Sequence, residues 1–600
     1  MLERIRARRA WGVSILGVSA AVALIVILGS TGGGVAAGAQ TQSLVADSAK
    51  LAPDSSAIAS VKSCASIAQQ TSLAALAQYP TAITGTNVVT PSGTAAPGNP
   101  TYCDVTGVIA PQTRFELKLP LTDWQGRYLQ NGCGGYCGAV GQQNFPSCDA
   151  TLGGDFAMAT DDEGHNGFSG GSLGSGGLFA FNDQKLRTEY GYESEQALYV
   201  VARYIIKYFY GQEPNYSYYN GCSDGGREAM EMAERYPNDF DGIIAGAPEI
   251  VAGPLNAEHQ TWDVRVNTDA NGNAILTDDK LPALHNAVIA ACGHDDGTND
   301  GIITDPQNCD FDPASIECQG ADAPSCLTSA QVEVVRKFYA GPSDPSGRLL
   351  YPGGLPYGSE GTGVFPGGWA LFELPPSQHG GSVPTTQSLD YSGLSQPYLR
   401  YQLLAPGVLG PDPFQGQFTD AGFRSMFPTA DIWDAMDTNL RAFRAHGGKL
   451  IIWQGWSDNG IPPTGTVDYY DTLASRMGGL RSTEQFARLF MLPSVYHCGG
   501  SYAGASVRDM VYPMVQWVED GTAPSQLTAS YTVGSASFSR PVYPYPDIPR
   551  YNGSGPTSDA ASFHAVPSPG AHYTNWLGNY LFYQPVGGSG GSEEGYSRRG

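Results

Sequence analysis

Apolar and polar positions follow different periods in successive parts of the chain. Residues 103–119 alternate apolar and polar side chains, which predicts antiparallel strands at a sheet edge. Continuous apolar runs at 242–247 and 449–456 predict buried parallel strands, whereas 193–210 places apolar side chains on one helical face. This alternation predicts an α/β fold, with a parallel sheet covered by helices on both faces. Further elements are predicted at 61–80 (helix), 124–128, 156–160 and 486–492 (strands) and 510–519 (helix).

The pattern changes between residues 251 and 430, where Gly, Pro and Asp become frequent and the alternation disappears. A chain of 600 residues is too long for one ordinary core. We therefore predict an α/β domain in two parts, 61–250 and 431–586, with an inserted lid domain over 251–430. Residues 40–60 are predicted to be a linker, and the Gly- and Ser-rich end, 587–600, is predicted to be disordered.

The first 39 residues have the organisation of a signal peptide. Four arginines among the first nine residues precede an apolar run at 11–28 and a small-residue sequence at 37–39. We predict cleavage before Gln40 and a secreted protein, extracellular or periplasmic, without stable membrane association; an uncleaved membrane anchor is the alternative. Export permits disulfides, and the 11 cysteines of the chain suit an oxidising compartment.

The charge balance narrows the class of partner. A net charge of −24 argues against nucleic acid and anionic membranes, because proteins bind both through an excess of Lys and Arg. The hydrophobic content of 41% and the aromatic content of 11% are typical of a globular protein. We therefore interpret the acidity as a property of a solvated surface.

The sequence around Ser223 predicts a nucleophile elbow. Gly221, Ser223 and Gly225 fill the G-x-S-x-G pattern, in which a serine lies on a tight strand-to-helix turn. An aromatic, strand-like run at 216–219 precedes the motif, and apolar residues at helical spacing follow it as far as Pro237. These flanks distinguish the motif from a chance match in a glycine-rich chain.

Two later residues complete a predicted catalytic triad. A serine hydroxyl needs a general base, usually His, which a carboxylate orients. In α/β-hydrolases the order along the chain is Ser, acid, His, and each residue follows a strand. Asp458 and His497 satisfy this order at the ends of predicted strands. Asp468 is the alternative acid, but its helical context is more typical of a solvated helix face.

A glycine-rich loop at 131–138 predicts an oxyanion hole. No G-K-[ST] sequence follows the loop, which argues against a phosphate-binding P-loop. A backbone N–H of this loop, assigned to Gly134, and the N–H of Asp224 would face the developing alkoxide. A plain tight turn is the alternative reading of the loop.

Cysteines adjoin two residues of the predicted triad. Cys222 precedes Ser223, and Cys498 follows His497. If the nucleophile and the base touch, the two sulfurs lie near bonding distance, so we predict a disulfide between them. The alternative is two small buried residues.

Residues 295–305 have carboxylates at close intervals with interleaved glycines, as calcium-binding loops do. No glutamate follows at the distance that an EF-hand requires. Cys292 and Cys309 bracket the loop and could close it, and Cys318 and Cys326 could close a second loop. A solvated acidic turn is the alternative.

Taken together, these motifs resemble the tannase/feruloyl esterase family of secreted α/β-hydrolases, which also holds the enzyme that hydrolyses mono(2-hydroxyethyl) terephthalate. The resemblance runs from about residue 64 to residue 582. The matching segments are GCSDGGR at 221–227, DDG and DG at 295–297 and 300–301, GGKLI at 447–451, GWSD at 455–458, and HCGG at 497–500.

The resemblance implies an α/β-hydrolase fold with a large inserted lid domain and the triad and active-site disulfide named above. It also implies one structural Ca²⁺ in the lid and no organic cofactor. The implied ligands are Asp296, Asp300 and the carbonyls of Thr298 and Ile302. The family has an Asp where this chain has Gly293, so Asp295 or Asp305 could take its place, or calcium binding could be weaker or lost.

Cysteines also mark a departure from the family, whose oxyanion loop is mostly glycine. Cys133, Cys137 and Cys148 lie in or near this loop and could form one further bridge, leaving one thiol. Cys64 and Cys103 are predicted to take part in disulfides as well.

The function predicted from these features is a secreted serine carboxylic ester hydrolase for small aromatic acyl esters, feruloyl or galloyl in type. A terephthalate monoester hydrolase and an acyltransferase on the same scaffold are alternatives. An inert, calcium-stabilised secreted binding protein is the alternative of another class. Four lid residues are candidates for substrate binding: Trp369, Arg400, Phe414 and Phe418.

Overall fold

The structure is a computed structural model. It describes residues 41–45, 57–76, 78–90, 100–140, 154–166, 173–361, 368–375, 382–426, 430–499, 506–533, 536–569 and 575–583. The predicted signal peptide, the predicted disordered tail and Cys148 lie outside these residues. Among the described residues, no helix has both the length and the apolarity needed to cross a membrane.

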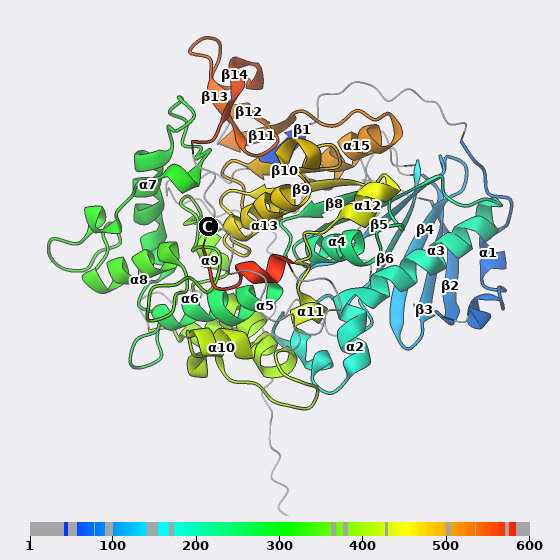
Figure 1. The fold of residues 1–600 in the computed structure, drawn as a ribbon, viewed down its shortest axis with the longest axis horizontal. Helices are drawn as coiled ribbons and strands as arrows, with labels where there is room; N and C mark the ends of the chain where they lie inside the picture. The colour runs from blue at the N-terminus through cyan, green and yellow to red at the C-terminus, as the bar shows by residue number, and fades with distance from the viewer. Residues whose placement is uncertain are drawn as a thin grey trace, which may run out of the picture.

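A nine-stranded sheet forms the centre of the described structure (Figure 1). Its strand order is β10-β9-β8-β7-β5-β6-β4-β3-β2. The strands from β10 to β6 run parallel, and β4, β3 and β2 extend the sheet with antiparallel pairs, as predicted for 103–119. The strand bounds are β2 (Thr81–Val89), β3 (Tyr102–Ile109), β4 (Thr113–Pro120), β5 (Arg127–Asn131), β6 (Phe156–Asp161), β7 (Tyr216–Cys222), β8 (Gly242–Gly246), β9 (Lys449–Gly455) and β10 (Ala487–Leu492).

Successive residues of the parallel strands enter two different cores, because side chains alternate across a strand. In β7, Tyr219 joins the core under α3 and α4, whereas Tyr218 joins the core under α15. In β9, Ile452 and Trp453 divide in the same way. Both faces of the sheet are therefore buried, which explains the continuous apolar runs of these strands and confirms the predicted α/β fold.

Helices cover the sheet on both faces, and the remaining strands form two smaller antiparallel sheets, β1-β11-β12 and β13-β14. The helices are α1 (Cys64–Ile67), α2 (Gln184–Thr188), α3 (Ser194–Tyr210), α4 (Asp224–Arg235), α12 (Arg441–His446), α13 (Pro463–Arg476) and α15 (Ser506–Glu519). The antiparallel strands are β1 (Thr41–Val45), β11 (Leu527–Val533), β12 (Ala536–Val542), β13 (Asp547–Tyr551) and β14 (Phe563–Pro567).

Two expectations for the first part of the chain differ from the structure. The helix predicted over 61–80 is reduced to the four residues of α1 and the short turn at Leu73–Ala75, which together bury Cys64, Ile67 and Leu73. Residues 41–45, predicted to belong to a linker, form strand β1, which pairs with β11.

A long insertion separates β8 from β9, which are neighbours in the sheet. Figure 1 shows its helices gathered on one side of the sheet. Leu284, Val335 and Trp369 belong to a separate hydrophobic core within the insertion. The helices are α5 (Ala252–Pro254), α6 (Gln260–Val266), α7 (Leu281–Cys292), α8 (Ser329–Ala340), α9 (Gly368–Leu371), α10 (Asp420–Ser425) and α11 (Ala430–Trp433).

Candidate active site

Ser223 lies on a strained turn between β7 and α4. Its backbone has φ 68° and ψ −124°, a conformation that a non-glycine residue adopts only when its surroundings enforce it. The enforcing contacts are tight, since a Cβ on Gly221 would lie 2.2 Å from the Gly225 carbonyl oxygen. A Cβ on Gly226 would lie 2.3 Å from the Gly246 carbonyl oxygen. The glycines of the motif are thus a steric requirement of the turn.

The structure brings Ser223, His497 and Asp458 together at the carboxyl ends of β7, β10 and β9. His497 Nε2 lies 2.9 Å from Ser223 Oγ, and His497 Nδ1 lies 2.9 Å from Asp458 Oδ2. Asp458 is fully buried and also accepts hydrogen bonds from Gln454 Nε2 at 2.7 Å and Ile461 N at 2.9 Å. This geometry allows the serine hydroxyl to pass its proton to the imidazole while the carboxylate fixes the ring.

Asp468, the alternative acid, lies elsewhere. Its Oδ2 accepts hydrogen bonds from Trp576 Nε1 at 2.8 Å and from Asn579 Nδ2 at 3.1 Å. It is a buried structural carboxylate rather than part of a solvated helix face.

The pKa of His497 is higher than its ordinary value. Burial by itself lowers this pKa, but the charge of Asp458 and its hydrogen bond raise it by more. The carboxylate of Glu249 contributes a further upward shift. The ring therefore holds a proton more readily than a free histidine does, which suits a base that must accept one.

Glu249 is a member of the site that sequence reasoning missed. It follows β8, and its backbone N–H donates to the Ser223 carbonyl at 3.4 Å. Asn256 Nδ2 donates to its side chain at 2.5 Å. Burial and the nearby Asp224 raise the pKa of Glu249 to about 7. Its position just beyond a parallel strand was the only signal in the sequence.

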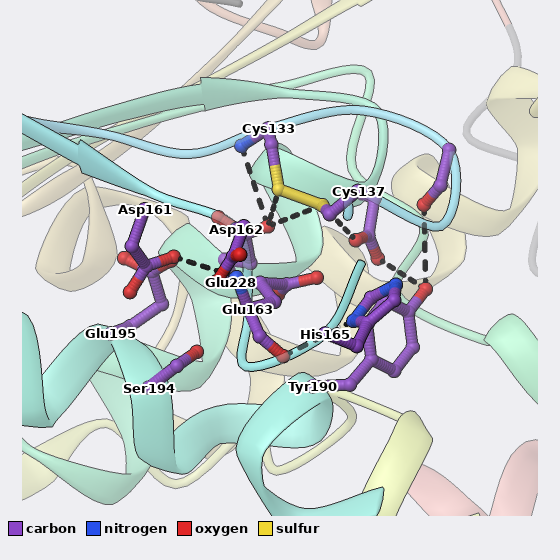
Figure 2. The surroundings of a disulfide bond; sticks show 12 residues. Cys133, Cys137, Asp161, Asp162, Glu163, His165, Tyr190, Ser194, Glu195 and Glu228 are labelled. Carbon is purple, nitrogen blue, oxygen red and sulfur yellow. Dashed lines mark hydrogen bonds between the residues drawn. A yellow bond between two sulfur atoms is a disulfide. The ribbon is translucent and has the colours of Figure 1, made fainter. Parts of the chain in front are cut away.

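The predicted oxyanion loop is fixed against the first turn of α4. Gly225 N donates to the Cys133 carbonyl at 2.7 Å, and a disulfide joins Cys133 to Cys137 (Figure 2). A Cβ on Gly134 would meet no heavy atom within 4 Å, so this part of the loop borders open space. Asp224 opens α4, where backbone N–H groups have no acceptor within the helix. Both predicted donors are therefore on segments that can offer an N–H.

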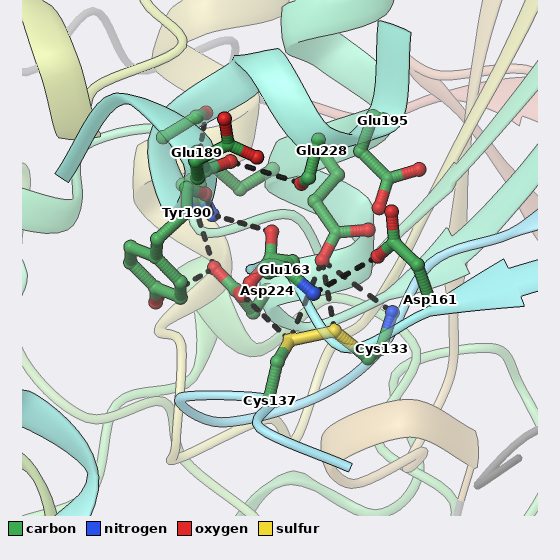
Figure 3. A network of polar contacts seen from close by, with 12 residues as sticks. Cys133, Cys137, Asp161, Glu163, Glu189, Tyr190, Glu195, Asp224 and Glu228 are labelled. Atoms are coloured by element: carbon green, nitrogen blue, oxygen red, sulfur yellow. Dashed lines mark hydrogen bonds and ion pairs between the residues drawn. A yellow bond between two sulfur atoms is a disulfide. The ribbon is translucent and has the colours of Figure 1, made fainter. Parts of the chain in front are cut away.

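Behind the loop lies a buried network of carboxylates around one arginine (Figure 3). Arg227 Nε donates to Asp224 Oδ1 at 2.6 Å, and Arg227 Nη2 lies 3.4 Å from Glu163 Oε1. Glu228 accepts a hydrogen bond from the Tyr219 hydroxyl at 2.5 Å. Burial raises the pKa of both Glu163 and Glu228, so these groups hold protons that carboxyls at the surface would lose. The network contacts both the predicted oxyanion loop, where Cys133 N donates to Glu228, and the start of α4, where Asp224 pairs with Arg227.

Five disulfides are present among the described residues. One joins Cys222 to Cys498 and so ties the serine turn to the histidine loop. The other four are Cys64–Cys103, Cys133–Cys137, Cys292–Cys309 and Cys318–Cys326.

Among the described residues, two buried clusters could hold a metal ion, and neither belongs to the predicted calcium loop. One comprises Asp263, Glu373 and Asp390, whose ligand atoms lie within 4.8 Å of one another. The other lies in the network around Arg227 and comprises Cys133, Cys137, Glu163, Asp224 and Glu228. Its two cysteines form a disulfide and therefore offer no thiolate ligand.

The predicted calcium loop itself does not fit the ion. Asp296 and Asp300 both form ion pairs with Arg540, whose guanidinium lies where a cation would bind. Asp295 accepts hydrogen bonds from the backbone N–H groups of Thr304 and Asp305 and is not available as a replacement ligand. Calcium coordination by Asp295, Asp296 and Asp300, with the Thr298 and Ile302 carbonyls, stays a prediction that these contacts do not support.

All four candidate substrate residues of the insertion contact other parts of the chain. Trp369 is fully buried and donates to Ser359 Oγ at 2.8 Å, so it is a core residue. Arg400 Nη1 donates to the Gly410 carbonyl at 2.8 Å. Phe418 packs against Trp262 and Arg265.

Phe418 also lines a surface cavity of about 540 Å³ that has no triad residue in its lining. Phe414 is exposed and contacts Tyr391. Phe372, which was not among the four candidates, does adjoin the triad, because its ring centroid lies 5.8 Å from that of His497.

Comparison with known proteins gives consistent results. Residues 98–566 match the family model described as tannase and feruloyl esterase. The chain is 32% identical over 540 residues to the mono(2-hydroxyethyl) terephthalate hydrolase of Piscinibacter sakaiensis, covering 80% of this chain and 87% of the relative. It is 29% identical to a probable feruloyl esterase of Arthroderma benhamiae, over 76% of this chain and 83% of the relative. The crystal structure of an esterase from Aspergillus oryzae superposes with a TM-score of 0.67 at 26% identity, covering 81% and 97% of the two chains.

Removal of the Cys222–Cys498 disulfide should cost both stability and the reactivity of Ser223. The bridge joins residues 276 apart, and closing so long a loop stabilises a fold by about 2–5 kcal/mol. We expect the Cys222→Ser/Cys498→Ser variant to melt at a lower temperature and to react more slowly with a fluorophosphonate. Cys318→Ser/Cys326→Ser is the control, because it opens a bridge of separation 8 and should leave labelling unchanged. Equal labelling of both variants would contradict this role.

Glu249→Gln should shift the pH dependence of Ser223 labelling. Labelling needs neutral His497, so its rate rises with pH as the imidazole loses its proton. Glu249 raises the pKa of His497, and removing its charge should therefore move the half-maximal rate to lower pH. The difference should be largest above pH 7, where the Glu249 carboxyl is ionised. Glu333→Gln makes the same change on an exposed helix and should leave the profile in place.

Proposed function

The chain belongs to the tannase and feruloyl esterase family and is a carboxylic ester hydrolase, and we propose that it cleaves aromatic acyl esters through Ser223, His497 and Asp458. The observation that carries the proposal is the continuous contact from Ser223 Oγ to His497 Nε2 and from His497 Nδ1 to Asp458. A binding protein would have no use for a strained serine held against a buried imidazole–carboxylate pair.

The reaction would proceed in two halves. Ser223 attacks the ester carbonyl while His497 takes its proton, and Asp458 stabilises the imidazolium that forms. The N–H groups of Asp224 and Gly134 receive the oxyanion. His497 then protonates the departing alcohol, and water, activated by the same imidazole, releases the acid from the acyl-enzyme.

Substrate choice belongs to the insertion, which we propose acts as a lid over the triad. Phe372 supports an aromatic acyl group, because its ring meets that of His497 edge to face and so lies beside the general base. The Asp263–Glu373–Asp390 cluster of the insertion is linked to the triad. Asn459, the residue after Asp458, donates a hydrogen bond to Glu373.

A neutral feruloyl or galloyl ester suits the charges near the triad better than a terephthalate monoester does. A monoester brings a carboxylate that needs a cationic partner, and Arg400 donates instead to the Gly410 carbonyl. Glu249 adds negative charge beside His497. Terephthalate monoester hydrolysis remains the second candidate, because the relative at 32% identity carries that activity in its name.

Export through residues 1–39 belongs to the same proposal. The five disulfides support an oxidising compartment, where such bridges persist. The proposal gives calcium no part in the reaction, since the loop at 293–302 contributes no atom to the triad contacts.

Substitutions at the triad should abolish turnover while leaving the fold intact. Ser223→Ala should lower kcat by several orders of magnitude, and Asp458→Asn by about 10⁴-fold, because the amide lacks the charge that stabilises the imidazolium and holds the imidazole in the wrong tautomer. Asp468→Asn is the matched control, since Asp468 contacts Trp576 and Asn579 and should keep wild-type kcat. Circular dichroism checks folding. Activity retained by Ser223→Ala would remove this serine from the mechanism.

A release assay on methyl ferulate, methyl gallate and a terephthalate monoester should rank the monoester last in kcat/KM. Glu249→Gln should narrow this gap by improving the monoester more than the two neutral esters, because a charge that repels its carboxylate has been removed, whereas the shift in the pKa of His497 acts on all three substrates. Wild-type preference for the monoester would favour the second candidate. Ester exchange with an added alcohol in place of acid release would indicate an acyltransferase.

A further inference from the structure

The acidic loop of the insertion is occupied by an arginine from the far end of the chain. Arg540 lies on β12, and its side chain is fully buried against the loop. Its Nε donates to Asp296 Oδ2 at 3.2 Å, and its Nη2 forms an ion pair with Asp300 Oδ2. One guanidinium thus bridges the two carboxylates that were expected to coordinate calcium.

The remaining carboxylate oxygens face the loop itself. Asp296 Oδ1 accepts from the backbone N–H and the hydroxyl of Thr298, at 2.8 and 2.7 Å. Asp300 Oδ1 accepts from the N–H of Ile302 at 3.1 Å. Each aspartate therefore divides its two oxygens in the same way, one to the loop backbone and one to Arg540. A calcium ion 2.3–2.6 Å from these oxygens would overlap the guanidinium.

The loop has also lost the ligand that would complete a calcium site. Gly293 stands where the family has an aspartate, and a Cβ there would lie 2.8 Å from the Ile289 carbonyl oxygen and 2.9 Å from Gly301 Cα. Asp305, the other possible replacement, accepts hydrogen bonds from Asn308 and Ser568 instead. The backbone around Gly293 has closed over the position where a third carboxylate would lie.

The guanidinium, by contrast, is fully provided with partners. Its Nη1 donates to the carbonyls of Ser539 at 2.9 Å and Thr557 at 2.6 Å. The ring of Phe563 lies 4.2 Å from its centre, a favourable position for a cation. A metal ion that took its place would leave the buried guanidinium without its carboxylate partners, Asp296 and Asp300, and an uncompensated buried charge is strongly destabilising.

We propose that Arg540 replaces the calcium ion of this family in the present chain, so that the insertion is held in place without metal. The arginine supplies the positive charge, and because it lies on β12 it also fastens the loop to that strand. Two further hydrogen bonds join the loop to β13. Tyr551 N donates to the Asp296 carbonyl at 2.8 Å, and Arg550 Nη1 donates to the Asp295 carbonyl at 2.6 Å. A metal ion would bind within the loop, whereas the arginine joins two units of the fold.

The wild-type protein tests the proposal directly. Protein purified without chelator should contain well below one calcium per chain by inductively coupled plasma mass spectrometry. Its melting temperature should be the same in excess EGTA and in millimolar CaCl₂. One bound calcium per chain that is lost in Asp296→Asn, together with a lower melting temperature of the wild type in EGTA, would overturn the proposal, and neither measurement depends on esterase activity.

Variants locate the effect at the arginine. Arg540→Ala should lower the melting temperature by several degrees, because Asp296 is left buried without its partner. Added CaCl₂ should recover part of this loss in the variant and none in the wild type. Arg550→Ala is the matched control, since it removes a neighbouring arginine that contacts only a backbone carbonyl, and it should show a small loss without calcium dependence.

Equal melting temperatures for Arg540→Ala and Arg550→Ala would also overturn the proposal. Should Arg540→Ala yield no folded protein, Arg540→Lys retains the charge without the two-pronged geometry and should melt below the Arg550→Ala control. The wild-type metal content and chelator measurements decide the question independently of either variant.

Discussion

The contact between the Ser223 hydroxyl and His497 Nε2 imposes the strictest constraint on this fold, because it joins residues 274 positions apart. The parallel sheet makes it possible by bringing the carboxyl ends of β7, β9 and β10 to one edge. The strained backbone of Ser223, the glycines beneath it and the burial of Asp458 all act to hold this one geometry. Preorganisation of this kind lowers the cost of aligning the reacting groups when substrate arrives.

The site rests on an unusual amount of buried negative charge. Asp224, Glu163 and Glu228 surround the single cation Arg227 behind the oxyanion loop. Burial raises the pKa of Glu163 and Glu228, which favours their neutral forms, and Arg227 offsets part of the negative charge of the network. The same low-dielectric surroundings strengthen the interaction between Asp458 and His497.

Sequence reasoning succeeded where the information was local or followed strand order. The elbow was visible because glycine spacing and flanking periodicity occur within twenty residues, and the acid and the base followed because each must lie just beyond a parallel strand. It failed where the partner was distant. Asp296 and Arg540 are separated by 244 positions, so the spacing of the loop predicted a cation but could not reveal the arginine that pairs with the loop in the structure. The contacts of Trp369 and Arg400 could not be predicted for a related reason. The sequence around an aromatic or cationic residue does not show whether its side chain faces a substrate or the interior of the insertion.

The Cys222–Cys498 bridge connects the assembly of the reaction centre to the redox state of its surroundings. A chain still inside a reducing cytosol would have both thiols free, and the histidine loop would lack its covalent tie to the serine turn. The enzyme would then reach its competent form only after translocation, where electrons can be drawn off the two sulfurs. Such a coupling would spare esters of the producing cell from hydrolysis without any inhibitor or propeptide.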